Sequence, residues 1–254
     1  MCGIAGISAK PGDLNARTLS SALLRKIEVR GRDATGVAFV DTRAAHRRDR
    51  VSGALRINKA PVSARAFIGS DKFDVDPAAR TVLLHTRLAT QGSTKRNVNN
   101  HPIVAGDVVG VHNGVLDNDR EIFAEIKVER RGEVDSEAAF ALLNWWTEHP
   151  TDILEAVQGR AALAWVDRRT GTDLHLARLE GSPLAVAMTA AGSLIFASTA
   201  ILLEQALKEA KVGVEFVIEL PEWSYLRVDH GRIVDYSASL RAEGGKEVRR
   251  AKQA

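Results

Sequence analysis

Cys2 is the only cysteine among the 254 residues of the chain, and it follows Met1 directly. Removal of Met1 would leave a thiol and a free α-amino group on the same residue. An α-amino group titrates at about 7.7–8.0, so near neutral pH a useful fraction of it can accept the thiol proton. A nucleophile activated by its own N-terminal amine is a recognised form of covalent catalysis. Cys2 is therefore either such a nucleophile or an unreactive thiol at a frayed terminus, and residues further along the chain must decide.

Three further segments gather polar side chains where we expect strands to meet loops. Arg87 follows an apolar run, and it can hold a carboxylate through two parallel hydrogen bonds or be an ordinary surface arginine. Asn113 and Gly114 can form an oxyanion hole, although the same pair is common in hairpin turns. Asp135 can pair with the ammonium group of a substrate, although an aspartate at this place can equally cap a helix. Each segment alone is ambiguous.

Two histidines, His101 and His112, fall in the second of these segments, which spans residues 99–114. Histidines in a polar region raise the question of a metal site or of general base catalysis. A metal site would need acidic or cysteine ligands at suitable spacing, and the neighbouring sequence offers none. We therefore expect both histidines to fix loops, and we expect neither a metal nor a cofactor.

The elements that must position these residues are short strands and a few helices. Apolar runs predict strands at 2–8, 36–41, 81–85, 107–112, 161–166, 173–177, 184–188, 193–197, 215–219, 224–228 and 232–235. Helical spacing or a capping residue predicts helices at 14–29, 135–146 and 199–210, with Pro150 ending the second. The polar stretch 42–77 predicts exposed hairpins and a loop. Many short strands with few helices predict an α+β fold, in which helices cover two stacked, mainly antiparallel sheets.

Composition is that of a soluble globular protein, with 45% hydrophobic and 26% charged residues. A single cysteine excludes an internal disulfide, no apolar run approaches the roughly 20 residues of a membrane span, and a signal peptide is not recognisable. We therefore expect a cytoplasmic protein. The net charge of +3 arises from short basic clusters with acids beside them and without interleaved aromatics. Such clusters predict solvated surface and not a nucleic-acid site.

Taken together and in this order, the motifs resemble class II glutamine amidotransferases, which are of the Ntn-hydrolase type. The segments that carry the resemblance are 2–7 (Cys-Gly-Ile-Ala-Gly-Ile), 30–36, 85–118, 134–143, 181–184 and 196–198. They are most similar to the glutaminase domain of glucosamine-6-phosphate synthase. The resemblance implies a four-layer αββα sandwich and a single domain over residues 2–240. The polar segment 241–254 is predicted to be a mobile tail.

The resemblance also implies a role for each residue that matches. Cys2 would be the nucleophile, and Asn113 with Gly114 would form the oxyanion hole. Arg87 would bind the α-carboxylate of glutamine and Asp135 its α-ammonium group. The residues expected to line the pocket or to belong to the lid and neighbouring loops are Thr90, Arg30, Leu88, Gln91 and His101. The family has tryptophan at the position of Leu88 and histidine at that of Gln91, so closure of the lid over glutamine is expected to differ here.

These features predict an enzyme that hydrolyses the side-chain amide of L-glutamine through a thioester on Cys2. A sugar-isomerase, phosphoribosyl-binding or P-loop domain is not recognisable in the chain. We therefore expect a stand-alone glutaminase that passes ammonia to a separate synthase, with the acceptor left open. Two alternatives remain at this stage. One is a γ-glutamyl amide hydrolase acting on a larger metabolite, and the other is a non-catalytic glutamine-binding regulatory module.

Overall fold

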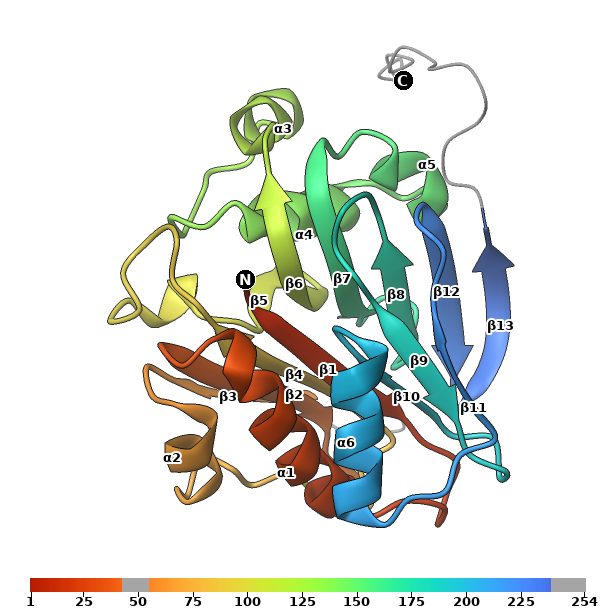
Figure 1. Ribbon diagram of the computed structural model, residues 1–254. Helices are drawn as coiled ribbons and strands as arrows, with labels where there is room; N and C mark the ends of the chain where they lie inside the picture. Colours follow the sequence, from red (N-terminus) through yellow and green to blue (C-terminus); the bar gives the residue numbers. More distant parts are fainter. Residues whose placement is uncertain (43–54, 239–254) are drawn as a thin grey trace, which may run out of the picture.

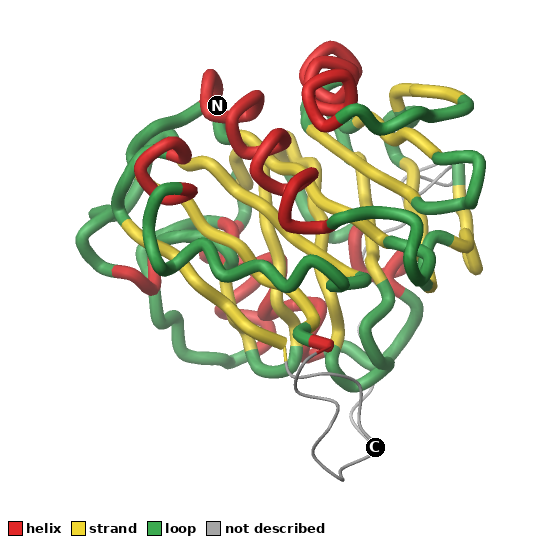
Figure 2. Tube along the Cα trace, turned by 90° about the horizontal axis from the view of Figure 1, so that it is seen from below, coloured by secondary structure: helices red, strands yellow, loops and turns green. Residues whose placement is uncertain are grey.

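Two antiparallel sheets lie face to face, and helices cover the outer face of each one in the computed structural model (Figure 1). Figure 2 shows the strands enclosed between two sets of helices. The structure describes residues 1–42 and 55–238, so the predicted tail 241–254 lies outside the described residues. The expected α+β fold of two stacked sheets is confirmed.

The first sheet has seven strands and contains the N-terminus at its centre. Its spatial order is β11 (Phe216–Glu219), β9 (Ala185–Met188), β10 (Leu194–Ala197), β1 (Gly3–Ser8), β4 (Thr81–Arg87), β2 (Ala34–Val40) and β3 (Leu55–Ala60). Its outer face packs against α1 (Ala16–Ile27), α2 (Ala64–Ile68) and α6 (Ala200–Ala210).

The second sheet has six strands and carries β6 next to its edge. Its spatial order is β13 (Arg232–Ser237), β12 (Ser224–Asp229), β8 (Leu174–Arg178), β7 (Gly159–Asp167), β6 (Val108–Leu116) and β5 (Ile103–Ala105). Its outer face packs against α3 (Asp119–Ile126), α4 (Ser136–Trp145) and α5 (Pro150–Leu154). Two short 3₁₀ turns, η1 (Glu28–Arg30) and η3 (Asn97–Asn99), complete the described elements.

Alternation along the strands divides the core into layers. Ile4, Leu83 and Val111 belong to the apolar cluster between the two sheets. Their neighbours Ala5 and Leu84 instead belong to the cluster beneath α1 and α6. Because successive side chains of a strand point to opposite faces, every second residue of β1, β4 and β6 is directed into the space between the sheets.

Helix α1 illustrates why the sequence forms its elements. Its leucines and Ile27 recur at helical spacing and are fully buried against the first sheet. Each buried leucine contributes about 1.5–3 kcal/mol relative to an exposed one. The Asn15 side chain accepts a hydrogen bond from Thr18 N at 3.0 Å and so caps the first turn.

Three expectations from the sequence are wrong in detail. The strand predicted to end at residue 112 continues to Leu116, so Asn113 and Gly114 lie within β6 and pair with Ala162 and Ala161 of β7. They form neither a hairpin turn nor a junction between strand and loop. Pairing with β7 continues past them because Gly114 adopts a φ of 152°, and a Cβ there would lie 1.8 Å from the Arg160 carbonyl oxygen.

The second error concerns Pro150, which does not end the helix that begins near residue 135. Helix α4 ends at Trp145, and Pro150 occupies the first turn of a separate helix, α5. Proline is favoured there because its missing N–H group would have no partner in the first turn. The segment 42–77 is likewise not simply hairpins and loop, because it contains β3 and α2; its residues 43–54 lie outside the described residues. Within the described residues, helices are all too short or too polar to cross a bilayer.

Candidate active site

The ends of β1, β4 and β6 meet around a small pocket that also reaches the start of α4. Its lining combines most of the residues predicted from the sequence with three others: Cys2, Arg87, Leu88, Thr90, Gln91, His101, His112, Gly114, Val134, Asp135 and Ser136. The enclosed space is about 20 Å³, which is room for roughly one water molecule. Arg30 and Asn113 are not part of this lining.

Cys2 is half-buried directly before the central strand β1. Its Sγ lies 3.6 Å from the Leu88 carbonyl oxygen. Burial raises the pKa of the Cys2 thiol above its ordinary value, and the contact with Leu88 and the N-terminal positive charge offset only part of that effect. The thiol is therefore protonated near neutral pH and needs a base before it can react.

Arg30 holds the backbone on which Cys2 stands. Its Nε donates a hydrogen bond to the Cys2 carbonyl oxygen at 2.8 Å, so Arg30 holds the main chain of Cys2. Asp33, in the same loop, accepts a hydrogen bond from Ala89 N at 2.8 Å. One loop thus fixes both the start of β1 and the start of the segment after β4.

Arg87 is almost fully buried at the end of β4 and faces the loop that follows it. Its Nη1 donates to Asn100 Oδ1 at 2.8 Å, and its Nη2 donates to the carbonyl oxygens of Gly92, at 2.9 Å, and Gln91. Burial lowers the pKa of Arg87, and nearby acids, among them Asp33 and Asp135, act in the opposite direction. A guanidinium group nevertheless keeps its charge in proteins.

Asp135 joins the end of β6 to the beginning of α4. Its Oδ2 accepts a hydrogen bond from Leu116 N at 2.7 Å, and its Oδ1 accepts one from Ser136 N at 2.9 Å. The carboxylate therefore has a fixed position on the pocket wall, in the same lining as Arg87. A negative and a positive charge are held near one thiol.

Asn113 is fully buried, and within the described chain neither atom of its amide has a hydrogen-bond partner. Buried polar groups without partners are uncommon in folded proteins. Asn113 is two residues from Val111, and Cys2 is two residues from Ile4, and both Val111 and Ile4 point between the sheets. Because alternate residues of a strand point to the same face, Asn113 and Cys2 are directed between the sheets as well. The next residue, Gly114, lines the pocket.

Three buried histidines surround these groups. The His85 and His101 rings stack with centroids 4.0 Å apart, and His85 Nε2 lies 3.2 Å from the His112 carbonyl oxygen. Burial lowers the pKa of His85 to about 3 and also lowers the pKa values of His101 and His112, so all three rings are neutral. His112 Nδ1 lies 2.8 Å from Ser136 Oγ, a contact that the sequence did not suggest.

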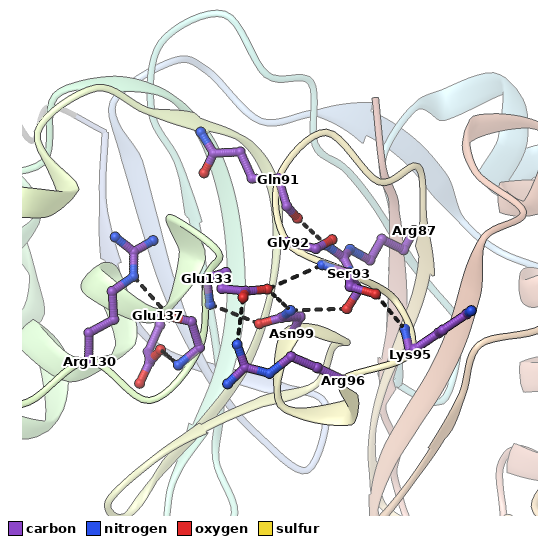
Figure 3. A network of polar contacts seen from close by, with 11 residues as sticks. Arg87, Gln91, Gly92, Ser93, Lys95, Arg96, Asn99, Arg130, Glu133 and Glu137 are labelled. Carbon is purple, nitrogen blue, oxygen red and sulfur yellow. Dashed lines mark hydrogen bonds and ion pairs between the residues drawn. The ribbon is translucent and has the colours of Figure 1, made fainter.

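The segment after β4 is held by a network that sequence reasoning missed (Figure 3). Glu133 accepts hydrogen bonds from Asn99 Nδ2 at 2.7 Å, Arg96 Nη1 at 2.5 Å and Ser93 N at 3.2 Å, while Glu133 N donates to Asn99 Oδ1 at 2.8 Å. We call this group the Glu133 anchor. Figure 3 also shows the Gln91 side chain directed away from Arg87, so Gln91 contributes through its backbone.

Lys59 is a second residue that the sequence did not single out. Its Nζ donates hydrogen bonds to the carbonyl oxygens of Asn100, at 2.6 Å, and Pro102, at 2.8 Å. Lysine in a polar stretch gives no local signal of such a role. In the described parts of the chain, His, Cys, Asp and Glu side chains do not gather into a group of three or more that could hold a metal ion.

Comparison with known proteins places the chain in a family. A family model described as "Glutamine amidotransferase domain" matches residues 85–205. A glutamine–fructose-6-phosphate aminotransferase (isomerizing) of Aliivibrio fischeri is 32% identical over 201 residues, which cover 73% of this chain and 30% of that protein. The chain belongs to the class II glutamine amidotransferases. It is thus an enzyme with a glutamine amidotransferase domain, the unit that hydrolyses glutamine to give ammonia.

Two further matches cover nearly the whole chain. The corresponding aminotransferase of Mycolicibacterium smegmatis is 27% identical over 264 residues, covering 98% of this chain and 40% of that protein. The chain therefore spans well under half the length of these amidotransferases. A solved glutamine phosphoribosylpyrophosphate amidotransferase of B. subtilis matches 93% of this chain and 49% of its own, with a TM-score of 0.73. At 16% identity, that likeness shows the Ntn-hydrolase fold alone.

Proposed function

We propose that the chain hydrolyses the side-chain amide of L-glutamine through a thioester on Cys2, after Met1 has been removed, and passes the ammonia to a synthase domain or partner. The observation that carries the proposal is one pocket in which a half-buried thiol lies with a buried arginine and a fixed aspartate. Arg87 would bind the α-carboxylate of glutamine and Asp135 its α-ammonium group.

The chemistry requires a base for the thiol, because burial raises the pKa of Cys2. The α-amino group of the mature Cys2 would take the thiol proton, and the thiolate would attack the amide carbon. The oxyanion would accept hydrogen bonds from Asn113 Nδ2 and Gly114 N–H. Collapse would break the C–N bond, with the amine returning its proton to the leaving ammonia. Water would then hydrolyse the γ-glutamyl thioester to glutamate and regenerate the thiol.

Substrate selection would follow from the two charges. An amide without the α-carboxylate and α-ammonium groups would leave Arg87 and Asp135 unsatisfied and would bind poorly. The pocket as described holds about one water, so glutamine entry requires the loop after Arg87 to move. The carbonyl oxygens of Gln91 and Gly92 would then exchange places with the substrate carboxylate on Arg87. Thr90, Leu88 and Gln91 would form the moving side of the pocket.

The decisive experiment measures glutamate and ammonia release from glutamine, together with the N-terminal mass of the active protein. We expect a mature chain that begins at Cys2, and complete loss of turnover in Cys2→Ala. A glutamine analogue that carries an electrophile at the amide position should label the wild type once and leave Cys2→Ala unlabelled. Full activity with Met1 retained, or in Cys2→Ala, would refute the mechanism. Turnover of a larger γ-glutamyl amide without turnover of glutamine would replace glutamine as the substrate.

A further inference from the structure

A second pocket is lined by residues 97, 98, 103 and 104, which lie on either side of Asn100 in the sequence. It is separate from the proposed glutamine pocket. It has a volume of about 210 Å³. Its polar lining includes Lys59, Arg131 and Glu137, and its apolar lining includes Val98, Ile103 and Val104. The glutamine pocket has no lining residue in common with it. The two cationic side chains come from β3 and from the loop before α4, so the fold brings them together from distant parts of the sequence.

Lys59 carries a half-buried charge that lacks an acidic partner among the described residues. Its ammonium group has three N–H donors, and two of them bind the carbonyl oxygens of Asn100 and Pro102. Burial and the neighbouring Arg131 lower the pKa of Lys59 to about 8. Within residues 1–42 and 55–238, carboxylate groups do not form an ion pair with Lys59. A charge in this position is stabilised by an anion that reaches the third donor.

The other charged groups around Lys59 leave the pocket with a positive balance. The Glu137 carboxylate is held by the backbone N–H groups of Arg131, at 2.9 Å, and Gly132, at 2.6 Å. His85 and His101, which face Lys59 from the neighbouring elements, are neutral because burial lowers their pKa values. Arg87 adds a further positive charge on the side of the glutamine pocket. The sum of Lys59, Arg131 and Glu137 is one net positive charge.

We propose that this pocket binds an oxyanion, a carboxylate or a sulfate-like or phosphate-like group, between Lys59 and Arg131, and that its occupancy favours glutamine binding. The coupling rests on the proposed function, and it runs through one residue. Lys59 binds the carbonyl oxygen of Asn100, and the side chain of Asn100 binds Arg87 Nη1 at 2.8 Å. An anion that fixes Lys59 would therefore fix Asn100 and the orientation of Arg87.

Calorimetric titration of the full chain with sodium sulfate, against sodium chloride at equal ionic strength, tests the site. Sulfate keeps its charge across neutral pH, so any pH dependence reports on the protein. We expect saturable sulfate binding that weakens as the pH rises through about 8, where Lys59 loses its proton. Arg131→Gln should weaken it about tenfold, and Lys59→Met by at least as much. Lys95→Met, which removes an exposed charge from the neighbouring loop, should leave sulfate binding unchanged.

Arg131 is exposed, so Arg131→Gln tests the site even if Lys59→Met destabilises the fold; thermal unfolding of each variant checks this. Absence of saturable binding, or full binding by both variants, would overturn the site. Sulfate should also lower the KM for glutamine in the wild type and not in Arg131→Gln. An unchanged KM in an active enzyme that binds sulfate would overturn the coupling. These readouts are separate from the test of Cys2, because sulfate binding does not require glutamine turnover.

Discussion

The two sides of the proposed glutamine pocket are built in different ways. Cys2, Asn113 and Gly114, which we call the strand wall, stand on or next to β1 and β6 and are held by backbone pairing with neighbouring strands. Residues 88–100, which we call the loop wall, lack such pairing and are held by side chains, chiefly Arg87, Asn100 and the Glu133 anchor. The strand wall is fixed by the fold, whereas the loop wall can open at the expense of a few polar contacts. We therefore expect the strand wall to govern kcat and the loop wall to govern KM.

Replacing Asn113 should have the largest effect on activity. If it leaves kcat unchanged, the distinction between the two walls is wrong. Asn113→Ala removes a proposed oxyanion donor, and we expect kcat to fall about a hundredfold or more with little change in KM. Steady-state kinetics with glutamine measure both constants. Asn58→Ala, on β3 away from the pocket, is the matched control. A change confined to KM would show that the strand wall contributes to binding and not to the transition state.

The buried histidines next to the strand wall should make the free energy of unfolding of the chain depend on pH. His85 has a pKa of about 3 in the folded chain, against about 6.5 when unfolded, so only the unfolded state takes up a proton at mildly acidic pH. As the pH falls from 7.5 to 5, protonation of His85 in the unfolded state should therefore lower the free energy of unfolding by roughly 2 kcal/mol. Urea unfolding at the two pH values measures this loss. His85→Gln should reduce the difference by that amount, and an equal pH dependence in the variant would contradict the prediction.

The Glu133 anchor should give the smallest effect, confined to the loop wall. Glu133→Gln keeps the size of the side chain and removes its ion pair with Arg96. Because the ion pair between Glu133 and Arg96 is exposed, we expect a rise of about two- to fivefold in the KM for glutamine and an unchanged kcat. Glu129→Gln, an exposed neighbour, serves as the control. A loss of kcat alone would show that the loop wall takes part in chemistry, which would remove the distinction between the two walls.

The sequence predicted those elements whose signal is local. Leucines at helical spacing located α1, and apolar runs located β1, β4 and β7, because both patterns repeat within a few residues. The strand β5 has three residues and α2 and α5 have five each, which is too short for any periodicity to show. Asn113 and Gly114 were placed at the end of a strand because local composition favours a turn. Pairing with β7 outweighs that preference.

The residues of the candidate site also divide into those with a local signal in the sequence and those without one. Cys2, Arg87 and Asp135 could be proposed because each belongs to a motif with a characteristic neighbourhood, although their roles remain predictions. Lys59 and Glu133 could not, because their partners lie 34–43 residues away and the contacts exist only after the sheets have closed. Hydrogen bonds of this kind leave no local pattern in the sequence.

The place of β1 in the middle of the first sheet also has a consequence for biosynthesis. Ala5 pairs with Leu84 of β4 on one side and with Ala197 of β10 on the other. Strand β1 therefore leaves the ribosome well before β10, one of the two neighbours with which it pairs. Until residues near Ala197 have emerged, the segment after Cys2 lacks one neighbouring strand, and Cys2 has no fixed position. Ammonia release should accordingly begin only when synthesis of the domain is nearly complete, which keeps unfinished chains from consuming glutamine.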